Sequence, residues 1–387
     1  MSDSRTELNG NPIENKREFQ VLAKPVGARC NLHCHYCYYH STGYREWPGM
    51  TDDLLETYIR QHIVACTDSV IAFSWHGGEP TLFGLEGFRK IVALQKKYCP
   101  PDRRIVNGIQ TNGVLLDEEW CRFLATEKIV VGLSLDGPEQ FHDLYRVTSK
   151  GKRTFHKVLQ VYDRLCTYDV QTECLCVIHS GNVRQPRVVY EFFLGLEVPY
   201  LTFLPLVEPL SHGRTSNRTV PAEDWGVFLC TIFDMWKNRD IGRIKVQIFE
   251  EAARPAFGLE HTLCIFRKVC GGVPVLECNG DMYSCDHFIS AEHLLGNIRK
   301  VPLTVILDSP QQKTFGRAKS STLPRQCLNC SELDMCNGGC PKNRFIQTSD
   351  GESGLNYLCA GYKRFFSYCR PFVDAIAKVR SQQNEDY

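Results

Sequence analysis

The sequence predicts an α/β fold in which a parallel sheet is followed by a region rich in cysteine. Between residue 19 and about residue 210, short β-branched and aromatic runs alternate with longer amphipathic patterns. Such alternation is typical of parallel strands joined by helices. Past residue 260, long apolar runs become scarce and cysteines frequent. A segment of that composition cannot easily bury a core of its own and needs metal to hold its shape.

The predicted strands and helices alternate along the chain. We expect strands at residues 19–23, 70–75, 104–110, 129–135, 171–178 and 200–206. We expect helices at residues 51–66, 85–98, 117–126, 154–168 and 187–196. Thr51, Asp52 and Asp53 form a favourable helix start, because a capping hydroxyl is followed by acids in the first turn. The pattern suits an open doubly wound sheet or a partial barrel, and in both the functional residues follow the carboxyl ends of the strands.

Composition divides the chain into four parts. Residues 1–18 are polar and predict a disordered tail, and residues 19–220 hold the alternating pattern. Residues 221–260 predict a helical bridge, because aromatic and aliphatic residues recur there at three- and four-residue steps. Residues 261–387 form the cysteine-rich part with a C-terminal helix, and residues 275–284 within it predict a β-hairpin around Asn279 and Gly280.

The bulk composition describes a soluble globular protein, with 43% hydrophobic and 23% charged residues in a chain of 387. The formal charge of +1 gives no general attraction to nucleic acid or to an anionic membrane, so neither partner is expected. No apolar signal-peptide core and no run of about 18 apolar residues is present. We therefore expect a cytoplasmic protein, in which disulfides are disfavoured and many of the 20 cysteines bind metal.

Three cysteines, Cys30, Cys34 and Cys37, follow the first predicted strand at C-x3-C-x2-C spacing. Three thiolates can hold three irons of a [4Fe–4S] cluster and leave the fourth iron open for chemistry. A structural zinc site is normally closed by four ligands. A zinc loop completed by one of the nearby histidines is the alternative interpretation of this stretch.

The later cysteines form two groups. The first group is Cys264, Cys270, Cys278 and Cys285, and the second is Cys327, Cys330, Cys336 and Cys340, followed by Cys359 and Cys369. The C-x2-C pair in the second group is well suited to a zinc ribbon, so the spacing alone leaves a pair of zinc sites open.

The first cysteine motif, with Tyr36 as the aromatic residue before its last cysteine, resembles the signature of the radical S-adenosylmethionine (SAM) enzymes. The resemblance implies a partial (β/α)6 TIM-like barrel, in which the open iron binds SAM and the reduced cluster splits it into methionine and a 5′-deoxyadenosyl radical. Gly77, Gly78 and Glu79 match the family's GGEP motif, which binds the methionine amino group of SAM. Without the resemblance, these residues describe an ordinary turn.

Further SAM contacts are implied after the fourth and sixth predicted strands. The family comparison favours Ser134 as a SAM contact, Arg146 as the partner of its carboxylate and Val207 as an apolar contact. Asp136 belongs to the same polar strand end as Ser134, which is suited to ribose hydroxyls. From the residues alone, the polar groups could equally cap a helix, Arg146 lie on the surface and Val207 lie in the core.

The later cysteines resemble the SPASM domain of radical SAM enzymes that modify peptides and proteins. That domain carries two auxiliary [4Fe–4S] clusters, which makes three clusters with the one that binds SAM. Matching by position implies one auxiliary cluster at Cys264, Cys270, Cys285 and Cys340, and the other at Cys327, Cys330, Cys336 and Cys359. Cys278 lies between two of these ligands and is the residue most able to upset the assignment.

Several longer motifs together resemble the anaerobic sulfatase-maturating enzymes, which convert a Cys or Ser of a sulfatase to Cα-formylglycine. The motifs lie at residues 24–25, 77–82, 110–113, 132–138, 285–288, 336–342 and 355–359. The resemblance implies abstraction of a hydrogen atom from Cβ of the target, followed by loss of a proton and of one electron. A base must therefore lie beside the target heteroatom, and Asp286 matches the acid assigned to this role.

The same resemblance implies the partners and the residues that face them. The substrate is an unfolded or nascent sulfatase polypeptide with a segment of the form (C/S)-x-(P/A)-x-R, and the electron donor is of the flavodoxin or ferredoxin type. Tyr39 and His76 are expected to face the peptide, although Tyr39 also suits packing against the cysteine loop and position 76 is often Gln in the family. We expect a monomer. Two alternatives stay open, a SPASM-type peptide maturase that forms a thioether crosslink and a non-catalytic zinc-binding interaction module.

Overall fold

The computed structural model describes residues 19–41 and 48–385, so the expected tail at residues 1–18 lies outside the described part. Within it, one sheet has the strand order β10-β9-β8-β1-β2-β3-β4-β5-β6-β7. The barrel strands are β1 (Leu22–Ala23), β2 (Val70–Trp75), β3 (Arg104–Thr111), β4 (Val130–Ser134), β5 (Thr172–Ile178) and β6 (Tyr200–Pro205). Each pairs in parallel with the next. Because the sheet ends in two edges, the barrel is partial, as expected.

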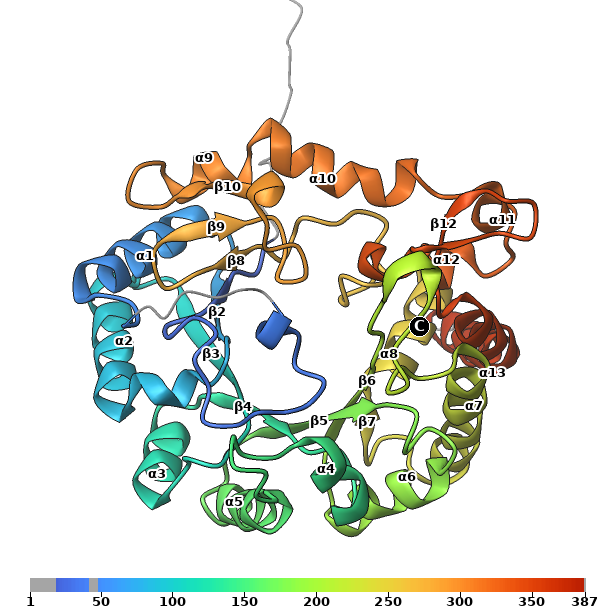
Figure 1. Ribbon diagram of the computed structural model, residues 1–387, viewed down its shortest axis with the longest axis horizontal. Coiled ribbons are helices and arrows are strands. Elements are labelled where there is room, and N and C mark those ends of the chain that lie inside the picture. The colour runs from blue at the N-terminus through green and yellow to red at the C-terminus, as the bar shows by residue number, and fades with distance from the viewer. Residues whose placement is uncertain (1–18, 42–47, 386–387) are drawn as a thin grey trace, which may run out of the picture.

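Helices cover the outside of this curved sheet, while the segment after β1 crosses its interior (Figure 1). The predicted helices are present as α1 (Asp52–Ala65), α2 (Leu85–Tyr98), α3 (Glu118–Thr126), α5 (Phe155–Thr167) and α6 (Pro186–Gly195). The additional short elements are η1 (Tyr38–Ser41), η2 (Pro80–Phe83), α4 (Glu139–Tyr145) and η3 (Ser211–Gly213). Strong apolar periodicity explains why the long helices were predictable to within about one residue.

The first strand is shorter than the sequence predicts. Residues 19–23 were expected, but the ladder comprises Leu22–Ala23 between β2 and β8 (Val275–Leu276). Upstream, the amide of Gln20 donates to the carbonyl oxygen of Gly272 at 2.8 Å, outside any regular strand. The cysteine-rich part of the chain therefore also holds the residues that directly precede β1.

The predicted helical bridge contains α7 (Ala222–Arg239), α8 (Gln247–Ala253) and η4 (Arg254–Phe257). It also contains a short strand that the sequence did not predict, β7 (Lys245–Val246), which pairs with β6. Trp225, Phe228 and Phe233 of α7 are buried, and Phe233 packs edge-on against Phe365 of the C-terminal helix α13 (Cys359–Glu385). The bridge therefore joins the barrel to the end of the chain through a common core.

Most elements of the cysteine-rich part have two to five residues, and the longer ones are its 12-residue helix at 310–321 and α13. The predicted hairpin is confirmed as β8 paired antiparallel with β9 (Asp281–Tyr283), and Gly280 in its turn has φ of +94°. The remaining elements are η5 (Ala291–His293), β10 (Leu294–Asn297), α9 (Leu303–Leu307), α10 (Pro310–Ser321), α11 (Arg325–Leu328), α12 (Leu333–Cys336), η6 (Pro341–Asn343), β11 (Ile346–Gln347) and β12 (Ser353–Leu355). Because β8 pairs with β1, this hairpin extends the barrel sheet instead of forming a separate one.

Two further properties bear on the sequence expectations. All 20 cysteines lie in the described part of the chain, and none of them forms a disulfide. Among the described helices, none combines the length and the apolar character that a membrane crossing requires.

Candidate active site

A cavity of about 330 Å³ lies at the carboxyl ends of the barrel strands. Of the residues expected at the SAM site, Cys30, Cys34, Tyr36, Cys37, Gly77, Gly78, Ser134, Arg146 and Val207 line it. Tyr39 and His76, which were expected to face the peptide, line the same cavity together with His287, Cys340 and Lys342 of the cysteine-rich part. Residues from both ends of the chain therefore converge on one space.

The three cysteines after β1 lie in a loop that backbone hydrogen bonds hold in place. The amide of His33 donates to the carbonyl oxygen of Val147 at 2.7 Å. Burial raises the pKa of Cys30 to about 12, and the charges of the neighbouring Cys34 and Cys37 thiols add to the shift. A metal centre relieves this cost because it binds the thiolate form, so the loop fits an iron–sulfur cluster.

Two glycines after β2 bring the backbone close to this loop. A Cβ atom on Gly78 would lie 2.3 Å from the carbonyl oxygens of Ala28 and Arg29, and one on Gly77 would lie 2.6 Å from that of Gly27. Gly77 also has φ of +122°, which side chains rarely adopt. The close approach leaves the backbone of both glycines on the cavity wall, where a ligand can meet it.

Glu79 is engaged within the fold, and its expected contact with the SAM amino group stays a prediction. Its side chain is fully buried and is not among the described residues that line the cavity. Oε1 accepts from the hydroxyls of Thr81 at 2.6 Å and Thr111 at 2.7 Å, and Oε2 accepts from the amide of Asn112 at 2.8 Å. The carboxylate therefore ties two loops together, and Gly77 and Gly78 of the preceding turn line the cavity.

Tyr36, Asp136 and Arg146 form a buried network. The Tyr36 hydroxyl donates to Asp136 Oδ2 at 2.5 Å and accepts from Arg146 Nη1 at 2.8 Å. Asp136 Oδ1 accepts from the amide of Val177 at 3.0 Å, and Asp136 is 0% exposed, so it supports the cavity wall from behind Tyr36 and Val177. Arg146 lines the cavity, and its buried Nε has no hydrogen-bond partner among the described residues. A guanidinium with a spare donor fits the binding of a carboxylate.

Ser134 and Val207 are placed by the ends of β4 and β6. The hydroxyl oxygen of Ser134 accepts from Gln110 Nε2 at 3.1 Å, and Val207 is 3% exposed. Both line the cavity, so Val207 belongs to the core and to the cavity wall at once. Their contact with SAM stays a prediction.

Asp286 lies behind the cavity wall and is 7% exposed. Its Oδ1 is 2.6 Å from Lys24 Nζ, the Tyr39 hydroxyl is 3.0 Å from both carboxylate oxygens, and the Tyr38 hydroxyl donates to Oδ2. Burial acts to raise the pKa of Asp286, but the charge of Lys24 and these hydrogen bonds together hold it below its usual range. Asp286 is therefore an anion whose tyrosine partners reach the cavity.

His76 presents an unused ring nitrogen at this wall. Its Nδ1 is buried and has no hydrogen-bond partner in the described part of the chain. Burial lowers the pKa of His76 although the charge of Asp286 opposes the shift, so the ring is neutral. A neutral imidazole with a spare nitrogen fits a polar substrate group.

The two predicted auxiliary ligand sets each gather in space. Cys264, Cys270, Cys285 and Cys340 are half-buried. Desolvation raises the pKa values of the first three, and the charges of neighbouring cysteines in the set add to the rise. Cys327, Cys330, Cys336 and Cys359 line one cavity of about 220 Å³. No three His, Cys, Asp or Glu side chains in the described ranges are spaced for a single metal ion. Each cysteine of a [4Fe–4S] cluster binds a different iron, so wider spacing suits a cluster.

Cys278, the residue most able to upset this assignment, is 3% exposed and packs in the hydrophobic core. Free cysteine in such surroundings behaves as a small apolar side chain. This position supports a ligand set that leaves Cys278 out.

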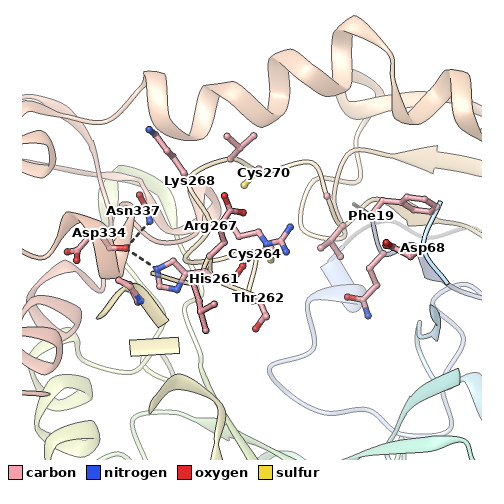
Figure 2. Close-up of a pocket in the computed structure, with 17 residues that line it drawn as sticks. Phe19, Asp68, His261, Thr262, Cys264, Arg267, Lys268, Cys270, Asp334 and Asn337 are labelled. Atoms are coloured by element: carbon pink, nitrogen blue, oxygen red, sulfur yellow. Dashed lines mark hydrogen bonds between the residues drawn. The ribbon is translucent and has the colours of Figure 1, made fainter. Parts of the chain in front are cut away.

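A larger cavity of about 780 Å³ lies beside the 261–273 segment (Figure 2). Cys264 and Cys270 line it, but the motif residues after the barrel strands do not. Its histidine is engaged in the fold, since His261 Nδ1 is 2.9 Å from Glu251 Oε2 and Nε2 is 2.9 Å from the carbonyl oxygen of Asp334. We therefore place the reaction in the smaller cavity, where the SAM and peptide motifs meet.

Four side chains at this site were assigned no role from the sequence, although two of them, Lys24 and Lys342, lie in motifs of the family resemblance. Lys24 is buried and forms ion pairs with Asp286 and with Glu277, which is also buried. Tyr38 donates a hydrogen bond to Asp286, and Lys342 lines the cavity. For Lys24, the available signal was a charged residue at the end of a strand that packs in the core. Nothing in the sequence spacing links Lys24 to Glu277, because 253 positions separate them.

The sequence matches two family models and curated relatives that cover most of the chain. A model of the radical SAM superfamily matches residues 25–192, and a model of the iron–sulfur cluster-binding SPASM domain matches residues 270–331. The serine-type anaerobic sulfatase-maturating enzyme of Bacteroides thetaiotaomicron is 42% identical over 382 residues, which cover 94% of this chain and 92% of that protein. The cysteine-type enzyme of Clostridium perfringens (strain 13 / Type A) is 31% identical and covers 92% of this chain and 98% of its own.

Solved structures give the same result. Native anSMEcpe with bound AdoMet superimposes with a TM-score of 0.86 at 31% identity, over 93% of this chain and 99% of that chain. Its complex with AdoMet and the Cp18Cys peptide gives a TM-score of 0.85 at 32% identity, with the same coverage. The chain therefore belongs to the anaerobic sulfatase-maturating enzymes, a family of radical SAM enzymes with a SPASM domain.

Proposed function

We propose that this chain oxidises a serine side chain of a sulfatase polypeptide to Cα-formylglycine without oxygen, and a cysteine less well. The sequence alone left the choice between Cys and Ser open. Relatives named as serine-type are 42%, 37% and 36% identical, whereas those named as cysteine-type are 31%, 32% and 29% identical. This difference supports the serine preference, and family membership favours formylglycine formation over a thioether crosslink.

The observation that carries the proposal is that residues expected to bind SAM and residues expected to face the peptide line the same cavity. Cys30, Cys34 and Cys37 lie in its wall with Arg146, and the Tyr38 hydroxyl of the same wall donates to Asp286. A radical generated at the cysteine loop and a base for the target hydroxyl would therefore act on one bound side chain.

The residues present fit SAM and iron–sulfur clusters. We assign the SAM cluster to the three cysteines after β1, the SAM carboxylate to Arg146 with Tyr36 behind it, and the amino group to the backbone at Gly77 and Gly78. Ser134 and Val207 complete this subsite, while Asp136 and Glu79 hold its walls. When bound, SAM and the reduced cluster supply the radical that removes a hydrogen atom from the target Cβ.

Two auxiliary [4Fe–4S] clusters, at the ligand sets Cys264, Cys270, Cys285, Cys340 and Cys327, Cys330, Cys336, Cys359, make three clusters in all. The match to an iron–sulfur cluster-binding domain supports this chemistry over zinc. A cluster that adjoins Asp286 through Cys285 is also a suitable acceptor for the electron that the target must lose.

The step that this chain's own residues perform is proton transfer. After the Cβ hydrogen atom has left, the target is a carbon radical beside oxygen, and its hydroxyl is far more acidic than that of an alcohol. Asp286 takes this proton, with the Tyr38 hydroxyl as the group on the cavity wall that connects to it. One hydrogen atom, one proton and one electron leave in total, which converts the alcohol to an aldehyde.

His76 and Tyr39 face the peptide in this proposal, with the spare nitrogen of His76 as a polar contact. The substrate is an unfolded or nascent polypeptide with a (C/S)-x-(P/A)-x-R segment, in line with the peptide complex of the related structure. A flavodoxin or ferredoxin supplies electrons to the SAM cluster. A monomeric, cytoplasmic enzyme remains the prediction from sequence.

Anaerobic turnover on matched peptides tests the reaction. The protein with reconstituted clusters, SAM and reductant is given a serine-type and a cysteine-type sulfatase peptide, and products are read by mass spectrometry. We expect formylglycine from both with a faster rate on serine, and 5′-deoxyadenosine alongside. Deoxyadenosine with both peptides unchanged would contradict sulfatase maturation and favour another peptide modification.

Asp286→Asn tests the base. We expect SAM cleavage to continue and formylglycine to fall by about 100-fold or more, since a carboxamide cannot accept the proton. Asp281→Asn is the matched control, because Asp281 lies in the same hairpin and its carboxylate accepts from Asn279 and Asn297 instead. Full product from Asp286→Asn would remove Asp286 from the role.

A further inference from the structure

Lys24, the residue after β1, is a lysine with 0% exposure. Burying a charged side chain costs free energy unless opposite charges accompany it. The Lys24 ammonium lies 2.6 Å from Asp286 Oδ1 and 2.8 Å from Glu277 Oε1. The barrel thus contributes a cation to two carboxylates of the cysteine-rich part.

The remaining partners of Asp286 also come from the barrel side. The Tyr39 hydroxyl is 3.0 Å from both carboxylate oxygens, and the Tyr38 hydroxyl donates to Oδ2. Lys24 supports this arrangement twice, since its Nζ also lies 4.3 Å from the centroid of the Tyr39 ring. Together, Lys24 and the two tyrosines fix the direction in which the carboxylate points.

Strand register places the lysine opposite its partners. Ala23 pairs with Leu276 in the parallel ladder of β1 and β8, and the amide of Lys24 donates to the carbonyl oxygen of Leu276 at 2.9 Å. Lys24 and Glu277 are therefore the next residues of two paired strands. A one-residue slip would turn these side chains to opposite faces, so the pairing of barrel and hairpin determines the contact.

We propose that Lys24 is a positioning residue for the oxidation and holds the Asp286 carboxylate toward the target. Glu277 is the second carboxylate that pairs with the Lys24 ammonium. The inference rests on the proposed role of Asp286 as base. In this proposal, Lys24 at the end of the first barrel strand aligns Asp286, which belongs to the cysteine-rich part.

The competing explanation is that Lys24 only clamps the barrel to the cysteine-rich part by its ion pairs. A variant of Glu277 distinguishes this explanation from the positioning role. Lys24→Met removes the partner of both carboxylates, whereas Glu277→Gln weakens the clamp and leaves the contact between Lys24 and Asp286. We expect Lys24→Met to lower the rate of formylglycine formation by about 100-fold, with the peptide KM changed less than about threefold. Glu277→Gln should stay within about tenfold of wild type. Equal losses in both variants would establish the clamp and overturn the proposal.

Three further readouts make the test specific. SAM cleavage should continue in Lys24→Met, so that deoxyadenosine formed per formylglycine rises. The double variant Lys24→Met with Asp286→Asn should be no slower than Asp286→Asn alone, because Lys24 acts through that carboxylate. Lys24→Arg, which keeps the charge, should be at least about tenfold faster than Lys24→Met. Additive losses in the double variant would overturn the proposal.

A crystal structure of Lys24→Met provides a readout that does not depend on the reaction. We expect the Asp286 carboxylate to turn away from its position between Lys24 and Tyr39, with the absorption spectrum of the clusters unchanged. An unmoved carboxylate would overturn the positioning role even if wild type proved to make no formylglycine. Full product from Asp286→Asn would instead overturn the base assignment, so the two failures are distinguishable.

Discussion

The two parts of the chain that form the cavity wall are stabilised in different ways. The barrel strands β2 and β3 are six and eight residues long, and their helices bury a continuous core that includes Tyr58, Phe73 and Trp75. In the cysteine-rich part, β8 and β11 have two residues each, and α11 and α12 have four. Long periodic elements hold their shape by packing, whereas short ones need another constraint. We therefore expect the barrel to fold without metal and the short elements at residues 325–358 to depend on it.

Removing single cluster ligands gives the largest contrast between these parts. Cys34→Ala should reduce SAM cleavage to background and leave the auxiliary clusters, because Cys34 lies in the loop to which we assign the SAM cluster. Cys336→Ala should remove about one third of the iron and expose residues 325–358 to protease, since its set then has three thiolates. Iron and sulfide content, deoxyadenosine formation and limited proteolysis measure both.

Cys278→Ala is the matched control for these variants. Its thiol packs in the core, so all iron should be retained and only stability should fall. Loss of iron from Cys278→Ala would contradict the ligand assignment. Protection of residues 325–358 after cluster loss in Cys336→Ala would contradict the metal dependence of this part.

On the barrel side, a single charged residue should control the affinity for SAM. Arg146 lines the cavity with a spare Nε, so Arg146→Met should weaken SAM binding by about 10- to 100-fold, the value of a charged hydrogen-bonded contact. Equilibrium dialysis with labelled SAM measures the change. Arg153→Met is the control, because the Arg153 side chain is 76% exposed. Equal affinities for wild type and Arg146→Met would remove this residue from the SAM subsite.

The same contrast explains which features the sequence could predict. The long helices and strands of the barrel were predicted because apolar periodicity is a local signal, and the hairpin at residues 275–284 because an Asn-Gly turn is one too. The two-residue strand β7 was missed since it has no period to detect. The partial barrel, as distinct from an open sheet, came from the family resemblance and not from the pattern.

At the site, contiguous motifs were predictable and long-range pairs were not. The glycines and cysteines expected at the SAM site reach the cavity because each motif ends a strand. The buried directions of Glu79 and Asp136 depend on donors from other loops, which no motif describes. The contact of Lys24 with Asp286 depends on the register between β1 and β8, which only the folded chain reveals.

The smallest effect concerns the acid sensitivity of the barrel core. His62 in α1 is 1% exposed, and its Nε2 lies 3.0 Å from the carbonyl oxygen of Ala72. Burial lowers the pKa of His62 from 6.5 to about 4 in the folded chain. Between these two pKa values the unfolded chain binds a proton at His62 and the folded chain does not. The stability that neutral His62 contributes is therefore fully present above about pH 6.5 and is lost as the pH falls toward 4. We expect about 2 kcal/mol to be lost from pH 7 to pH 5.

His62→Phe removes this titration and keeps a ring beside Phe73, whose centroid lies 4.2 Å from that of His62. Native-state hydrogen exchange of the α1 amides, measured at both pH values, should therefore show a smaller loss of opening free energy in the variant than in wild type. His156→Phe should leave the wild-type loss unchanged, because its side chain is 75% exposed. Parallel losses in wild type and His62→Phe would show that His62 takes up its proton without opening the barrel, and that packing there tolerates charge.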